Sequence, residues 1–122
     1  MSREKIPAAT PRLRRLEHLY GRLRRSLVGI GYIFPGSVVK RFMPCGNPSC
    51  RCAADPEQRH GPYYEWSRKV RGKTATARLT AGQARLYEGW IRNRRKLKKT
   101  LARMDAVSMQ IAQILKDADP TR

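Results

Sequence analysis

The chain has 122 residues, with 27 lysines and arginines against 9 aspartates and glutamates and a formal net charge of +18. This length fits one domain, 1–122, and the basic excess predicts a polyanionic partner, of which nucleic acid is the usual one. No apolar run is long enough to span a membrane, and the N-terminus lacks the pattern of a secretory signal, so we expect a cytoplasmic protein without a membrane partner.

The first predicted element is a basic helix over 11–29. Thr10 offers a capping oxygen, and Pro11 fixes φ at the first helical position. Apolar residues then recur at steps of three and four, as on a packed helix, at Leu13, Leu16, Tyr20, Leu23 and Leu27. Glycines at 29 and 31 end this pattern.

The middle segment, 37–79, is predicted to form a zinc knuckle with a short β-hairpin. A short strand candidate from Val38 to Met43 leads into the cysteines. Residues 63–70 and 73–79 are predicted as two strands joined by an Arg71-Gly72 turn.

A long basic helix is predicted over 81–118, with Thr80 as its cap. Its heptad-like positions are Trp90, Leu97, Leu101, Met104, Ser108, Ile111 and Leu115. At about 55 Å it would be twice as long as the first helix, on which we expect it to pack antiparallel in an α+β fold. The apolar end near Ile111 would lie beyond the first helix, which predicts either a homo-oligomer through this helix or a frayed tail.

All the cysteines and one of the two histidines lie close together in the sequence, as Cys45, Cys50, Cys52 and His60. Three cysteines are an odd number, which argues against a disulfide framework. Three thiolates and an imidazole complete a tetrahedral Zn²⁺ shell, and the surrounding Gly, Pro and Asn residues indicate a loop rather than a core. The alternatives are that the cysteines are small buried apolar residues and that His60 is only a turn residue before Gly-Pro.

Four protein ligands would fill the site, which predicts a structural rather than a catalytic metal. A catalytic zinc keeps one position open beside a base, and the H-x-E motif of zinc deaminases does not occur here. We therefore expect no enzymatic activity.

Basic residues on both helices and on the hairpin are predicted to contact nucleic acid. On the helices they are expected opposite the apolar positions, and no acidic residue interrupts the stretch from Ile91 to Ala102. Like charges at this density destabilise a helix unless phosphates neutralise them. The predicted contact residues are Arg14, Arg15, Arg22, Arg25, Arg68, Lys69, Arg71, Lys73, Arg92, Arg95, Lys96, Lys99 and Arg103.

The hairpin also carries Tyr63, Tyr64 and Trp66. These rings would either stack on nucleic-acid bases or form a small core beneath the zinc loop. The sequence leaves these two alternatives open.

The motifs C-G-N-P-S-C-R-C at 45–52 and H-G-P-Y-Y at 60–64 lie between Pro35-Gly-Ser and G-K-T at 72–74, with a long basic helix beyond. Over roughly residues 35–100 this pattern resembles a small bacterial family of uncharacterised proteins that carry the same Cys/His signature and are often encoded near transposases. The resemblance implies a zinc-binding accessory role on DNA and brings no catalytic residue.

These observations predict a zinc-stabilised DNA-binding accessory to a transposase or recombinase. An RNA- or ribosome-binding protein is the first alternative, since basic helices and zinc knuckles also serve RNA. The second is a subunit that docks a larger nucleic-acid enzyme through its apolar helix positions.

Overall fold

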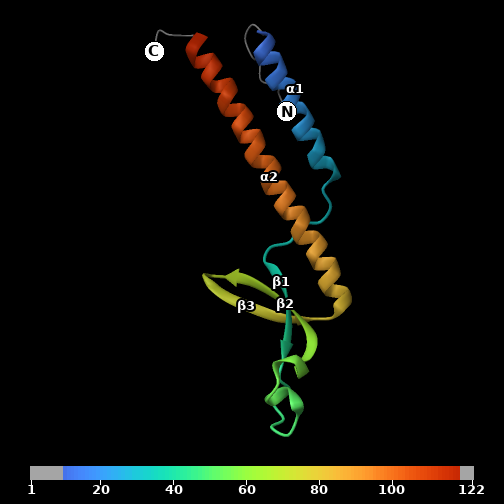
Figure 1. Ribbon diagram of the computed structural model, residues 1–122. Helices are drawn as coiled ribbons and strands as arrows, with labels where there is room; N and C mark the ends of the chain where they lie inside the picture. Colours follow the sequence, from blue (N-terminus) through green and yellow to red (C-terminus); the bar gives the residue numbers. More distant parts are fainter. Residues whose placement is uncertain (1–9, 119–122) are drawn as a thin grey trace. The chain divides into compact units, whose positions relative to one another are not determined.

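The computed structural model describes residues 10–118, which form two helices and a three-stranded sheet (Figure 1). The elements are helix α1 (Pro11–Ser26), a 3-10 turn (Leu27–Gly29), strand β1 (Ser37–Met43), two 3-10 turns (Arg51–Ala53 and Pro56–Gln58), strands β2 (His60–Val70) and β3 (Lys73–Leu79), and helix α2 (Ala81–Ala118). The predicted α+β class is confirmed. Among the described residues, none of the helices has both the length and the apolar character that a membrane crossing needs.

The chain divides into two compact units. The helical unit contains α1 and the part of α2 from Arg95 onward, and the sheet unit contains residues 31–94. Helix α2 therefore contributes its C-terminal part to one unit and its N-terminal part to the other. The assignment of 1–122 to a single domain stays a prediction.

In the helical unit, α1 runs alongside the C-terminal part of α2 in the opposite direction (Figure 1). The Thr10 hydroxyl accepts a hydrogen bond from Leu13 N at 3.2 Å, which caps α1 as its sequence predicts. The core between the helices is formed by Leu16, Leu23, Met104 and Val107. These apolar side chains hold the pair together by removing their surface from water.

The buried positions of α2 differ from those predicted. Ala84 and Ile91 are buried in its N-terminal part, and Thr100, Met104 and Val107 in its C-terminal part, where Ile111 and Ile114 pack against the helical core. Met104 and Ile111 pack as the heptad pattern predicted, but Leu101 is 45% exposed and Ser108 is exposed, so their places in that pattern were wrong. The first buried residue of α2 in the helical unit is the polar Thr100. A pattern search that follows only apolar residues misses it and therefore assigns the wrong positions to the buried face.

Ile111 packs against the core that α1 contributes, so the expectation that it lies beyond the reach of the first helix was wrong. The N-terminal part of α2, up to Arg94, belongs to the sheet unit. A homo-oligomer through the C-terminal helix stays a prediction, but an uncovered Ile111 no longer supports it.

The sheet unit is built on an antiparallel sheet in the order β1-β2-β3. Trp66, at the middle of β2, pairs with Val38 on one side and Ala77 on the other. The β2–β3 hairpin turns at Arg71 and Gly72, both with positive φ (52° and 80°), as a two-residue turn between twisted strands requires.

Aromatic side chains link the sheet to the N-terminal part of α2. Phe34 stacks on Trp66 with ring centroids 4.6 Å apart, and Trp66 meets the ring of Tyr87 on α2 edge-on at 6.1 Å. The Trp66 indole also donates a hydrogen bond to the Pro35 carbonyl at 2.9 Å. Trp66 is thus a half-buried member of an aromatic cluster that includes Tyr87 of α2.

Candidate metal centre and basic surfaces

The loop between β1 and β2, residues 44–59, folds back on itself through short-range hydrogen bonds. The Asn47 side-chain oxygen accepts from Ser49 N at 3.0 Å and from the Ser49 hydroxyl at 2.8 Å. The Cys50 amide donates to the Asn47 carbonyl at 3.0 Å. This turn brings Cys50 back toward Cys45, which lies just after β1.

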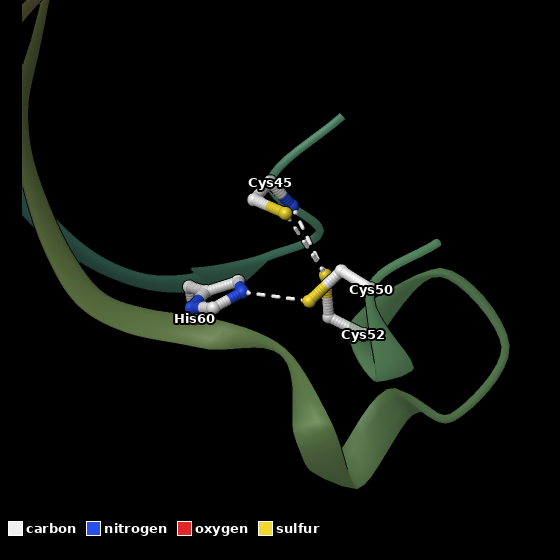
Figure 2. A group of neighbouring side chains, drawn as sticks. All are labelled: Cys45, Cys50, Cys52 and His60. Carbon is white, nitrogen blue, oxygen red and sulfur yellow. Dashed lines mark hydrogen bonds between the residues drawn. The ribbon is translucent and has the colours of Figure 1, made fainter. Parts of the chain in front are cut away.

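His60 comes close to the cysteines because it is the first residue of β2 and pairs with Met43 at the end of β1. Its Nε2 lies 3.2 Å from Cys50 Sγ, and Cys52 Sγ lies 3.5 Å from Cys45 Sγ (Figure 2). All four ligand atoms lie within 4.8 Å of one another. With Zn–S bonds of about 2.3 Å, the sulfurs of a tetrahedral site are about 3.8 Å apart, so this cluster is close enough to hold a metal ion.

The three thiols have different surroundings. Cys52 is buried, at 3% exposure, and its sulfur accepts a hydrogen bond from the Cys45 amide at 3.2 Å. Cys45 is exposed and Cys50 is half-buried, and all three are free cysteines. Cys45 and Cys50 therefore do not pack as apolar core residues, whereas Cys52 is buried.

The same surroundings shift two thiol pKa values in opposite directions. Hydrogen bonding from the Cys52 backbone, then from His60 and the other thiols, lowers the pKa of Cys50 from 9.0 to about 6. The backbone hydrogen bond from Cys45 lowers the pKa of Cys52, but burial and the neighbouring thiols outweigh it and raise that pKa overall. The Cys50 thiolate, the form that binds metals, is therefore favoured at neutral pH.

The helical unit carries a basic groove between its two helices. It encloses about 480 Å³, and it is lined by Leu19, Arg22, Leu23, Ser26, Lys96, Lys99, Thr100 and Arg103. Four of these residues were predicted to contact nucleic acid: Arg22, Lys96, Lys99 and Arg103. They line the groove together with the buried side chains of Leu23 and Thr100. The sequence had predicted them on the helix faces opposite the apolar positions.

The remaining predicted basic residues of the helices lie on exposed surface and do not line this groove. They are Arg14, Arg15 and Arg25 on α1, and Arg92 and Arg95 on α2. In the hairpin, Arg71 and Lys73 are exposed at the β2–β3 turn.

The sheet unit carries a second basic hollow, of about 450 Å³. It is lined by Pro35, Gly36, Ser37, Ser67, Arg68, Lys69, Thr74 and Arg94. Arg68 and Lys69 were among the predicted contact residues, but Arg94 and Ser37 were not. No local sequence signal marks these two, because only the packing of α2 and β1 around β2 brings them to the same hollow.

Among the hairpin aromatics, Trp66 and Tyr63 each lie beneath a guanidinium. Arg68 Cζ is 4.0 Å from the Trp66 ring centroid, and Arg78 Cζ is 4.4 Å from that of Tyr63.

Comparison with known proteins gives one family match. The family model described as "Domain of unknown function (DUF6788)" matches residues 9–88, from the start of α1 through the metal cluster and the sheet into α2. No curated protein and no solved structure matches the chain. Because the match covers more than half of the 122 residues, the chain belongs to the DUF6788 family.

Proposed function

We propose that this protein is a non-enzymatic, zinc-stabilised nucleic-acid-binding protein that acts on DNA as an accessory to a transposase or recombinase. The observation that carries the proposal is the pair of concave basic surfaces, one in each unit, neither of which has an acidic residue in its lining. Concave surfaces of one charge sign concentrate oppositely charged ligands.

Within the described part of the chain, the basic side chains have almost no acidic partners. Over residues 10–118 one ion pair forms, between Arg41 and Glu65 on neighbouring strands. The formal charge of +18 therefore remains almost entirely available to an external polyanion. An ordinary solvated surface would mix charge signs, and binding to phosphates would relieve the repulsion.

The metal cluster supports a structural role for zinc in this proposal. A three-sulfur, one-nitrogen donor set suits Zn²⁺, and its four groups would complete a tetrahedral shell. The loop 44–59 is poor in buried side chains, with Cys52 the one buried residue there. Zinc would supply the ordering that this loop cannot obtain from an apolar core.

A specific observation also favours a docking subunit as a second candidate. Leu101 is 45% exposed and Met109 is 72% exposed on α2, and a larger enzyme could cover these side chains. An RNA partner would use the same basic surfaces, so the following experiment compares DNA with RNA directly.

The test is a titration of labelled duplex DNA and of structured RNA with the zinc-loaded protein. Reversing two cations of the groove, Arg22→Glu with Lys99→Glu, should weaken DNA binding by at least about tenfold. The matched control, Arg12→Glu with Lys98→Glu, changes the same net charge at exposed positions outside the groove and should have a smaller effect. Equal effects of the two pairs, or no binding by the wild type, would contradict the proposal. Tighter binding to RNA than to DNA would favour the RNA alternative.

A further inference from the structure

The hollow of the sheet unit contains an arginine, Arg68, that forms no ion pair with any residue in the described range 10–118. Arg68 is half-buried, and its Nη1 atom is buried without a hydrogen-bond partner among the described residues. Proteins rarely leave a buried guanidinium nitrogen unpaired, because this forfeits hydrogen bonds that water would supply. Because the Arg68 side chain lines the hollow, a ligand bound there would supply an acceptor for this guanidinium.

The Arg68 side chain is also held in place. Its guanidinium lies over the Trp66 ring at 4.0 Å, and Trp66 is itself fixed by stacking on Phe34 and by its hydrogen bond to Pro35. Stacking fixes the plane of the guanidinium and therefore the directions in which its nitrogens can donate. Little side-chain entropy would then be lost when a ligand binds.

The rest of the hollow supplies donors. Arg94 adds a second half-buried guanidinium, and Ser37 and Ser67 add hydroxyls. Gly36 allows the backbone to approach this wall closely, because a Cβ there would collide with the Ser67 carbonyl and would come within 3.1 Å of Arg68 Cβ. The hollow is therefore rich in donors and has no carboxylate in its lining.

We propose that this hollow is a phosphate-binding site, in which Arg68 and Arg94 hold one phosphate group through charge-assisted hydrogen bonds. Two planar guanidiniums and nearby hydroxyls match the several oxygens of a tetrahedral phosphate better than the two of a carboxylate. That the phosphate belongs to nucleic acid rests on the proposed function. The chemistry of the site is the same for a backbone phosphodiester, a terminal phosphate and inorganic phosphate.

The first test uses inorganic phosphate alone, so that it does not depend on nucleic-acid binding. In ¹⁵N-labelled, zinc-loaded protein, the Nε–H signals of Arg68 and Arg94 should shift saturably when phosphate replaces chloride at constant ionic strength. Arg78 is the matched control, because it also lies over an aromatic ring but outside the hollow. Uniform shifts of all arginines, or no saturation, would overturn the proposal.

The second test uses duplex DNA with and without 5′-phosphates. Arg68→Lys and Arg94→Lys keep the charge but lose the planar fork, and each should weaken binding about tenfold, against less than about twofold for Arg78→Lys. A loss on both duplexes assigns a backbone phosphodiester, and a loss confined to the phosphorylated duplex assigns a terminal phosphate.

The two proposals fail differently. If the protein binds inorganic phosphate but no nucleic acid, the proposed function fails and the phosphate site stands. If it binds DNA while all three lysine variants match the wild type and phosphate leaves the Arg68 signal unchanged, the phosphate site fails and the function stands. Unchanged zinc content and circular dichroism of the variants would show that they are folded.

Discussion

Cys50 and Cys52 are two residues apart and yet have thiols of opposite character. Cys50 is half-buried with a pKa lowered to about 6, and Cys52 is buried with a raised pKa. The difference arises because amide and imidazole hydrogen bonds favour the Cys50 thiolate, whereas burial opposes the charge on Cys52. No single-residue property of the sequence distinguishes the two.

This contrast predicts selective alkylation of the metal-free protein. Above pH 6 Cys50 is a thiolate in the folded state, so iodoacetamide should modify Cys50 faster than Cys52, and the Cys50 rate should fall as the pH drops through about 6. Zinc should protect all three cysteines. Peptide mapping by mass spectrometry measures the rates, and equal rates for Cys50 and Cys52 in the folded metal-free protein would contradict the geometry.

The two histidines provide a matched pair for the metal site. His60 lies 3.2 Å from Cys50 Sγ, whereas His18 is exposed on α1. If four ligands share the zinc-binding free energy about equally, His60→Ala should weaken zinc binding by about 2 to 4 kcal/mol, and His18→Ala should leave it unchanged. Competition with a chromophoric chelator measures both values. Equal zinc affinities of the two variants would indicate that His60 is a turn residue and not a ligand.

At the scale of elements, the sequence predicted the kinds of structure better than their contacts. The Thr10 cap, the Arg71-Gly72 turn and the return of His60 to the cysteines all depend on local chemistry that the sequence carries. The buried face of α2 could not be predicted in full from the sequence, because Thr100 is polar but buried and Leu101 is apolar but exposed. The hollow could not be predicted either, because it combines residues of β1, β2, β3 and α2.

The difference in burial between Leu23 and Leu101 leads to a prediction about stability. Leu23→Ala should lower the free energy of unfolding by about 2 to 4 kcal/mol, because this side chain is buried in the core between α1 and α2. Leu101→Ala should cost less than about 1 kcal/mol, because nearly half of that side chain already contacts solvent. Chemical denaturation of the zinc-loaded protein, followed by circular dichroism, compares the two variants. A larger loss for Leu101→Ala would restore the heptad register read from the sequence.

For the whole molecule, the candidate metal site and the helical core lie in different units. The Cys/His cluster belongs to the sheet unit, and the Leu16, Leu23, Met104 and Val107 core belongs to the helical unit. Removing zinc with a chelator should therefore weaken the order of residues 44–60 while the α1–α2 core remains. Hydrogen exchange resolved by peptide should show faster exchange around the cysteines and little change in α1. Equal loss of protection in both units would mean that the metal stabilises the whole chain.

The charge of the whole molecule leads to a prediction about salt. Each phosphate contact on duplex DNA contributes a slope of about −0.9 to log K against log[salt], because binding releases condensed counterions. If the four cations of the helical groove and the two guanidiniums of the sheet hollow each meet a phosphate, the slope should be about −5. The double reversal of Arg22 and Lys99 should make it less steep by about 2, and Arg68→Lys should change affinity with little change in slope, since the charge is kept. Anisotropy titrations of labelled duplex at several salt concentrations measure both quantities. A slope near zero, or one that the reversal leaves unchanged, would show that these basic surfaces do not bind the DNA backbone.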